Sequence, residues 1–343
     1  MNPSMFQIEG DESTRTGEEA PLVGIAKLAA QSDSLRQGHL VEYFTLPARS
    51  LLNRCTSSRV PFKWTINPYR GCEFACKYCY ARYTHEFMEM REGVDFERKI
   101  YVKQQAAWLL RQDLKKVKLG EEIAIGTATD PYQPAEKRFE VTRGILEELV
   151  RHRGLELGIV TKSNLILRDV KLLRQVAEHN SLFVNVTVTT LDSNLARILE
   201  PRAPRPDLRL EAVWELNAAG VNAGVICAPV LPGISDSPVA LDALVCAAKQ
   251  AKAKYIYANP LFLKPCSSSV FLPFLEKEFP HLVEDYRTRF GSRAFVSKAY
   301  SKRISELMAS LRKKHGISQQ FSSRSESVHP PPQEIEQMNL FGV

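Results

Sequence analysis

The feature of this sequence that most constrains its fold and chemistry is a group of three cysteines, Cys72, Cys76 and Cys79, in a C-x3-C-x2-C spacing. They follow a short apolar run, residues 62–66, that is expected to be a strand. A structural zinc site normally has four ligands, and a ferredoxin-type run supplies four cysteines per cluster. Three thiolates on a 4Fe-4S cluster would leave one iron open to a small molecule.

The three cysteines, with Tyr78 directly before the last of them, resemble the signature of radical S-adenosylmethionine (radical SAM) enzymes. The resemblance implies a 4Fe-4S cluster whose open iron is chelated by S-adenosylmethionine and which receives an electron from an external donor. In that family the reduced cluster cleaves S-adenosylmethionine to methionine and a 5′-deoxyadenosyl radical. A Cys3His zinc site using His85 is the alternative, since a motif must be checked against its context.

The composition is that of an ordinary globular enzyme, with 343 residues, 44% hydrophobic and 25% charged. No uninterrupted run of about 18 apolar residues is present, so no membrane span is expected. The polar N-terminus lacks the apolar region of a secretory signal. Seven cysteines, three of them clustered, fit a reducing compartment, so we predict a cytoplasmic protein. The net charge of +7 permits DNA or RNA as a partner, and equally a merely soluble basic surface.

Short β-branched runs alternate with stretches of helical periodicity, which predicts a parallel sheet with right-handed crossovers. The expected strands are residues 62–66, 122–125, 155–161, 182–189, 221–226 and 255–258. The expected helices are residues 104–117, 141–151, 168–179, 208–219 and 238–253. Six strands match the partial (β/α)6 TIM-like barrel of the radical SAM type, and we predict this α/β fold with C-terminal helices and disordered tails.

The domain organisation follows from changes in composition along the chain. Residues 1–55 are expected to be a disordered segment, to about residue 38, followed by a strap against the core. Residues 56–265 form the predicted radical SAM core. Residues 266–317 are a predicted extension with helices at 271–290 and 297–315, and residues 318–343 are a predicted disordered tail rich in Ser, Gln, Glu and Pro.

Polar residues follow several of the expected strands, at the end of a parallel barrel where reactive sites lie. Together with residues 71–80, the pairs Thr129-Asp130, Thr161-Lys162 and Glu200-Pro201 and the run 229–233 resemble the DNA repair photolyase-like branch, which includes spore photoproduct lyase. The resemblance covers about residues 60–265. It implies contacts with S-adenosylmethionine from the following residues: Tyr78, Thr129, Asp130, Lys162 and Thr187. In the alternative interpretation, Thr129 and Asp130 cap a turn, Thr187 is a strand former and Lys162 is solvated.

The sequence departs from that branch at one position. Spore photoproduct lyase has a cysteine near the end of the second strand that returns a hydrogen atom to the substrate radical, and the matching residue here is Thr127. A hydroxyl O–H bond is too strong to replace a thiol in this role, so the lyase reaction itself is in doubt. Cys227 and Cys266 follow other strands and are candidate hydrogen-atom donors, although small buried cysteines are common in protein cores.

Three functions are consistent with these observations. The first is a radical SAM enzyme that acts on nucleic acid, by lesion repair or base modification. The second keeps the radical chemistry but takes a peptide or small-molecule substrate. The third is a non-catalytic nucleic-acid-binding protein stabilised by a metal.

The predicted tail carries a separate motif, with Gln337, Leu340 and Phe341 in a Gln-x-x-Leu-Phe spacing close to the C-terminus. It is similar to the peptide with which bacterial polymerases and repair proteins bind the DNA sliding clamp. Leu340 and Phe341 would fill an apolar pocket while Gln337 forms a hydrogen bond at its rim. Chance occurrence is the alternative.

Overall fold

The computed structural model describes residues 22–37, 41–56, 60–90 and 92–319. Its central element is a seven-stranded sheet in which six strands are parallel and lie side by side in chain order. These six are β4 (Trp64–Ile66), β7 (Glu122–Ile125), β8 (Glu156–Thr161), β9 (Ser181–Thr187), β10 (Asn222–Val230) and β11 (Ile256–Pro260). An edge strand, β3 (Leu52–Arg54), pairs antiparallel with β4. The predicted partial barrel is confirmed.

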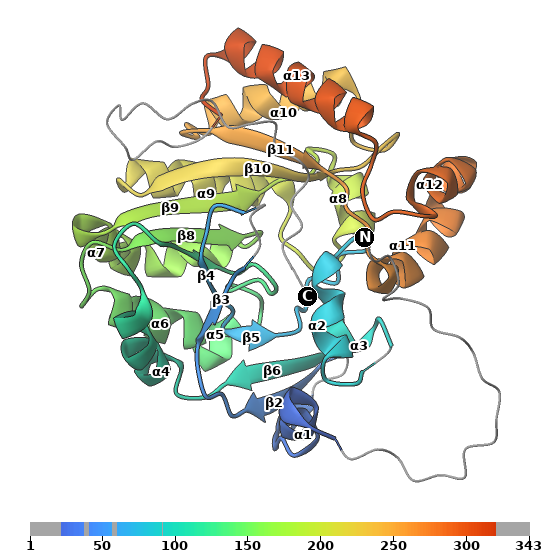
Figure 1. The fold of residues 1–343 in the computed structure, drawn as a ribbon. Coiled ribbons are helices and arrows are strands. Elements are labelled where there is room, and N and C mark those ends of the chain that lie inside the picture. Colours follow the sequence, from blue (N-terminus) through green and yellow to red (C-terminus); the bar gives the residue numbers. More distant parts are fainter. Residues whose placement is uncertain (1–21, 38–40, 57–59, 91, 320–343) are drawn as a thin grey trace, which may run out of the picture.

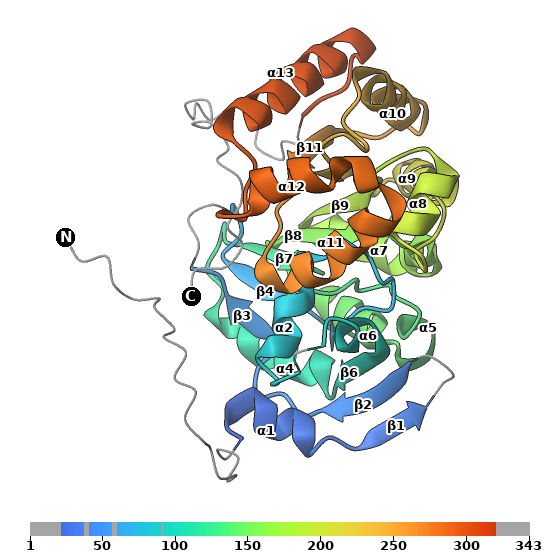
Figure 2. The same ribbon diagram turned by 90° about the vertical axis from the view of Figure 1, so that its right-hand side faces the viewer.

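Helices cover the outer face of this curved sheet (Figures 1 and 2). They are α4 (Ala106–Asp113), α6 (Val141–Leu149), α7 (Val170–His179), α9 (Pro206–Ala218) and α10 (Pro238–Gln250). Each falls within a predicted helical stretch or within two residues of it. Their apolar side chains and those of the strands form the largest core cluster, so the amphipathic periodicity in the sequence was a sufficient signal for this layer.

Successive residues of each strand point to opposite faces of the sheet. Val184 and Val186 of β9 pair with Ala223 and Val225 of β10, and all four belong to the helix-facing core. Residues between them, such as Asn185, therefore point to the concave side of the barrel, where the Asn185 side chain accepts a hydrogen bond from the Tyr255 hydroxyl at 2.9 Å. This alternation decides which strand residues face the candidate site.

A second, four-stranded sheet was not predicted. Its order is β1 (Ser34–Gln37), β2 (Glu42–Leu46), β6 (Lys99–Lys103) and β5 (Tyr69–Arg70). The prediction of disorder to about residue 38 is wrong for β1 and for helix α1 (Gly24–Ala30), which both lie in that segment. The strap is present as β2 and β3. Because β5 ends immediately before Gly71, this sheet fixes the entry to the cysteine motif.

The C-terminal extension also differs from the prediction. The helix expected at residues 271–290 is two helices, α11 (Pro265–Glu278) and α12 (Val283–Phe290), separated by a 3-10 turn (Pro280–Leu282) whose first residue, a proline, has no N–H to donate to the preceding helix. The second predicted helix is confirmed as α13 (Lys298–His315). No helix in the described part of the chain is long and apolar enough to span a membrane. Gln337, Leu340 and Phe341 lie outside the described residues, and the division into domains stays a prediction.

Candidate active site

The three cysteines lie on one loop, residues 71–80, which follows β5 and is called the cysteine loop below. It begins at Gly71, whose φ of 84° is in the left-handed region. A Cβ atom at this position would lie 2.7 Å from the carbonyl oxygen of Lys99 and 2.9 Å from that of Phe96, so only glycine fits. The Cys72 amide then donates to the Phe96 carbonyl at 2.9 Å, which fixes the first cysteine against the neighbouring chain.

Buried polar side chains hold the cysteine loop in shape. The Gln133 amide accepts from the Glu73 N–H at 3.0 Å and donates to the Gly71 carbonyl at 3.1 Å. The Glu73 carboxylate accepts from the Ala135 N–H at 2.7 Å and from the Tyr43 hydroxyl at 3.0 Å. Tyr43 belongs to β2, so the loop is fastened both to the barrel and to the N-terminal sheet. Sequence reasoning missed these residues, because nothing local marks contacts about 60 positions apart.

The cysteine residues suit an iron–sulfur cluster better than a single metal ion. Cys72 and Cys76 are buried and Cys79 is half-buried, within an apolar cluster that also includes Phe74 and Ala128. Among the described residues no three His, Cys, Asp or Glu side chains lie close enough to hold one ion. A cluster makes no such demand, since each thiolate binds a different iron. Burial raises the pKa of Cys76 to about 12, so binding of iron must displace a proton.

The Cys3His zinc alternative is not formed. His85 lies in α2 (Tyr83–Glu86), where its Nε2 is 3.0 Å from the Lys99 carbonyl oxygen. Its ring packs edge-on against Phe96, with the ring centres 5.3 Å apart. Burial lowers the pKa of His85 to about 4, so the side chain is a neutral member of the core beside the second sheet.

Lys162 and Tyr78 come together beside the cysteines. Lys162 follows β8, and its Nζ lies 5.7 Å from the centre of the Tyr78 ring. Burial by itself lowers the pKa of Lys162, but the nearby Cys76 and Glu200 outweigh this and raise it overall. A positive charge is therefore held at the strand ends, where the carboxylate of an amino acid could pair with it. The role of both residues as ligands remains a prediction.

Thr129 and Asp130 are engaged within the protein. The Thr129 hydroxyl donates to the Gly71 carbonyl at 2.6 Å and accepts from Gln133 at 2.9 Å. The Asp130 carboxylate accepts from the Thr161 hydroxyl and the Lys162 N–H, both at 2.7 Å. Asp130 also accepts from the Tyr132 N–H at 2.9 Å, which matches the turn-capping interpretation for this residue. The other contacts join the ends of β7 and β8 to the cysteine loop.

Thr187 lies at the end of β9, buried and at a concave-face position, since it alternates with Val186 of the helix-facing core. Its backbone carbonyl accepts a hydrogen bond from Arg209 at 3.1 Å. The same reasoning separates the two candidate hydrogen-atom donors. Cys227 shares the helix-facing core with Val225. Cys266 begins α11 beside the cysteine loop, with its Sγ 3.9 Å from the Tyr80 carbonyl oxygen. Cys266 is thus the better placed of the two.

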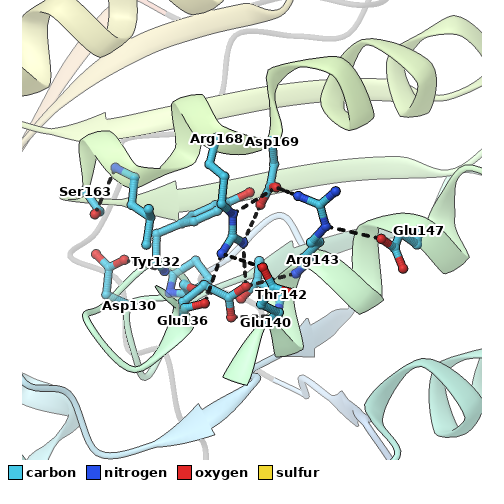
Figure 3. Close-up of polar contacts among 12 residues, drawn as sticks. Asp130, Tyr132, Glu136, Glu140, Thr142, Arg143, Glu147, Ser163, Arg168 and Asp169 are labelled. Atoms are coloured by element: carbon cyan, nitrogen blue, oxygen red, sulfur yellow. Dashed lines mark hydrogen bonds and ion pairs between the residues drawn. The ribbon is translucent and has the colours of Figure 1, made fainter. Parts of the chain in front are cut away.

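A buried ion network supports the strand that leads into the cysteine loop (Figure 3). Glu136 accepts a hydrogen bond from the Tyr69 hydroxyl of β5 at 2.5 Å and from Arg168 at 2.8 Å. Arg168 also pairs with Asp169 at 2.7 Å, and Arg143 pairs with the same carboxylate at 3.1 Å. Both carboxylates are fully buried. Two segments distant from β5 in sequence, residues 136–143 and 168–169, are thereby tied to this strand.

Aromatic side chains and one lysine gather on the far side of the cysteine loop. We call this set the aromatic patch, and it consists of Tyr80, Tyr83, Phe87, Phe262, Phe295 and Lys264. The rings form two groups: Tyr83 and Phe87, with centres 5.6 Å apart, and Phe262 with Tyr80 and Phe295, with centres 5.9 and 4.8 Å apart. Lys264 lies between the two groups, 5.9 Å from the Phe262 ring centre. The Nζ of Lys264 lies 4.6 Å from the Tyr83 ring centre.

A partial barrel with a three-cysteine loop at its strand ends is typical of radical SAM enzymes. Comparison with known proteins gives the same class. Residues 66–244 match the model of the Radical SAM superfamily, and the chain belongs to that superfamily. The protein Rv2578c of Mycobacterium tuberculosis is 34% identical over 279 residues, which are 81% of this chain and 82% of the relative. The protein MJ0683 of Methanocaldococcus jannaschii is 29% identical over 80% of this chain and 95% of the relative.

Among solved structures, spore photoproduct lyase complexed with dinucleoside spore photoproduct has the same fold. Its TM-score is 0.60 at 16% sequence identity, and the match covers 80% of this chain and 79% of that chain. Membership of the radical SAM superfamily, which the cysteine motif predicted, is confirmed, and the likeness to spore photoproduct lyase is one of fold. Since the chain is a radical SAM enzyme, the hypothesis of a non-catalytic metal-stabilised protein is set aside.

Proposed function

We propose that this enzyme acts on nucleic acid, with Cys72, Cys76 and Cys79 holding a 4Fe-4S cluster and the Tyr78–Lys162 region binding S-adenosylmethionine. When bound and reduced, the cluster would supply the one electron that breaks the sulfur–C5′ bond of S-adenosylmethionine, giving methionine and a 5′-deoxyadenosyl radical. Lys162 holds the carboxylate of that ligand, and the concave face of the barrel keeps water from it. The observation that carries the choice of substrate is the aromatic patch beside the cysteine loop.

The aromatic patch has the chemistry of a surface that binds nucleobases. Bases stack on aromatic rings whatever their sequence, at about 1–3 kcal/mol per base, and nearby cations pair with the phosphates. Phe87 is 53% exposed, so its ring is accessible to a base, and the half-buried Lys264 adds a positive charge to the same patch. Cys266 lies two residues after Lys264, which places a thiol within the same surface.

Two further observations support a nucleic-acid substrate. The net charge of +7 is compatible with a polyanionic partner. Spore photoproduct lyase, which shares the fold, has been solved with a dinucleoside lesion. We further propose Cys266, rather than Cys227, as the hydrogen-atom donor to a substrate radical, because of its place beside the cysteine loop. Analysis of the nucleic-acid product distinguishes the two candidate reactions, repair of a lesion and modification of a base.

Binding to labelled nucleic acids tests this proposal. We expect the enzyme to bind a single-stranded oligonucleotide at low salt, with an affinity that falls steeply as salt is raised, because phosphate contacts release counterions. Phe87→Ala should weaken binding roughly 5- to 100-fold, the effect of one lost stacking contact. Lys264→Gln should reduce the salt slope by about one. Fluorescence anisotropy with single-stranded DNA, duplex DNA and transfer RNA probes at several salt concentrations is the measurement.

Trp108→Ala is the matched control, since Trp108 is 55% exposed but lies on α4, on the outer side of the barrel. This variant should bind like the unmodified enzyme. No binding to any probe at low salt, or an equal loss in Trp108→Ala and Phe87→Ala, would count against a nucleic-acid substrate. The alternative, a peptide or small-molecule substrate, would then be preferred.

We also propose that the C-terminal tail binds the bacterial sliding clamp through Gln337, Leu340 and Phe341, which would bring the enzyme to DNA. A peptide of residues 334–343 is expected to bind the clamp of the source organism with micromolar affinity, as is typical of short segments that order on binding. The same peptide with Leu340→Ala and Phe341→Ala should not bind, because the two apolar anchors are gone. Titration calorimetry of both peptides against the clamp is the measurement. Equal, negligible heats of binding for the two peptides would contradict the proposed interaction with the clamp.

A further inference from the structure

The segment 199–202, called the Glu200 segment below, contacts the cysteine loop at successive positions, and no role in the reaction has yet been given to it. The Lys77 N–H donates to the Leu199 carbonyl at 2.9 Å. The Tyr78 hydroxyl donates to the Glu200 carboxylate. The Arg202 N–H donates to the Phe74 carbonyl at 3.3 Å. One face of the loop that carries the three cysteines is therefore shaped by residues more than 120 positions later in the chain.

Glu200 is the charged centre of this contact. Its side chain is 0% exposed, and it pairs with Arg209 of α9 at 2.5 Å, whose side chain is 1% exposed. Its other oxygen accepts from the Thr189 hydroxyl at 3.2 Å as well as from Tyr78. Arg209 is itself held by the carbonyl oxygens of Pro204 and Thr187, at 2.7 and 3.1 Å. Burying two charges is costly unless the geometry is well satisfied, so this carboxylate is fixed in position.

Fixing Glu200 also fixes the surroundings of Lys162. The Tyr78 ring is anchored at its hydroxyl by Glu200, and the Lys162 ammonium lies over the face of the same ring, 5.7 Å from its centre. The negative charge of Glu200 acts on that ammonium through the buried interior, where charges are poorly screened. Arg209, Glu200, Tyr78 and Lys162 thus form an ordered series from the outer helix to the candidate ligand site.

We propose that Glu200 is a positioning residue for S-adenosylmethionine binding: it places the Tyr78 ring and, through it, the Lys162 ammonium that receives the ligand carboxylate. This inference rests on the proposed binding role of Lys162. It gives the Glu200-Pro201 pair a function that the family resemblance did not supply. In the alternative, the Glu200–Arg209 ion pair only connects α9 to the cysteine loop. Glu200 would then have no effect on the affinity of Lys162 for S-adenosylmethionine.

A double-mutant cycle separates these two possibilities, because residues that act through one another give non-additive effects. Glu200→Gln keeps the size of the side chain and a hydrogen-bonding oxygen. We expect it to retain the iron and sulfide content of the unmodified enzyme and to raise the dissociation constant for S-adenosylmethionine about 10-fold, the cost of one charge-assisted contact. Lys162→Ala should weaken binding by a similar factor, and the double variant should bind no more weakly than Lys162→Ala alone.

Anaerobic equilibrium dialysis of the reconstituted enzyme gives the dissociation constants, and the electron paramagnetic resonance spectrum of the reduced cluster without ligand reports whether the cluster is disturbed. Asp207→Asn is the matched control, since it breaks an exposed ion pair with Arg205 at the start of the same helix. It should change neither quantity.

The outcomes are distinguishable. An unchanged dissociation constant in Lys162→Ala would remove the proposed ligand site itself. Weakened binding in Lys162→Ala, with additive losses or no effect of Glu200→Gln, would overturn only the positioning role. If Glu200→Gln fails to fold, Tyr78→Phe removes the hydroxyl alone, and its loss of affinity should likewise be non-additive with Lys162→Ala.

Discussion

Replacement of any one of Cys72, Cys76 and Cys79 with alanine is expected to abolish both cluster binding and 5′-deoxyadenosine formation. In the proposed assignment each thiolate binds one iron of the cluster, an alanine side chain cannot do so, and His85 does not replace it because it is turned into the core beside the second sheet. The measurement is iron and sulfide analysis after anaerobic reconstitution, followed by an assay for 5′-deoxyadenosine with dithionite and S-adenosylmethionine.

Cys246→Ala is the control for this experiment. Cys246 is a half-buried thiol of α10, on the outer helical layer, and its loss should leave cluster content and turnover unchanged. A variant at position 72, 76 or 79 that kept a full cluster and normal turnover would show that the ligand assignment is wrong. A colourless protein that contains one zinc and no sulfide would show that the protein does not hold a 4Fe-4S cluster.

Arg168→Ala is expected to lower the free energy of unfolding by about 3 kcal/mol, because it leaves the buried carboxylates of Glu136 and Asp169 without their shared cation. Asp169 keeps its contact with Arg143, so the loss should fall at the lower end of the range for a broken buried pair. Urea unfolding of the protein without its cluster measures the change directly. The reduced support for β5 should also slow cluster assembly, since Tyr69 depends on Glu136.

Arg205→Ala provides the comparison, because its ion pair with Asp207 is mostly exposed on both sides. Surface pairs of this kind contribute about 0–1 kcal/mol. Similar, small losses in the two variants would mean that the network of Figure 3 does not stabilise the fold in the way described.

Most of the barrel could be predicted from the sequence, because its strands and helices have a clear local pattern of apolar and polar residues. The runs at residues 122–125 and 155–161 are β-branched and flanked by polar turns, and each became a strand. The second sheet could not be found in this way. Its strand β5 has two residues, and its partners lie some thirty positions away, so pairing rather than pattern creates it. The break before α12 does have a signal in the sequence, Pro280, where a new turn begins.

The candidate site shows the same division. The cysteine spacing and the lysine after the third strand were visible, because both are short motifs with a chemical requirement. The alternation of Val225 and Cys227 could have shown that this thiol faces the helices. In contrast, Gln133, Glu73 and Arg209 act through partners 60 or more positions away or through buried pairs, and a polar residue destined for such a contact looks like any surface residue.

The contacts of the cysteine loop also set an order of events during synthesis of the chain. The Cys79 carbonyl accepts a hydrogen bond from Ser267, which follows it by 188 positions. The Tyr78 hydroxyl donates to Glu200, which follows it by 122 positions. When the three cysteines have been synthesised, the residues that later surround the cysteine loop, such as Glu200 and Ser267, are therefore still missing from the nascent chain. Because the surroundings of the three thiols are complete only after residue 267 has been synthesised, we expect the proposed cluster to be retained only once most of the chain has folded.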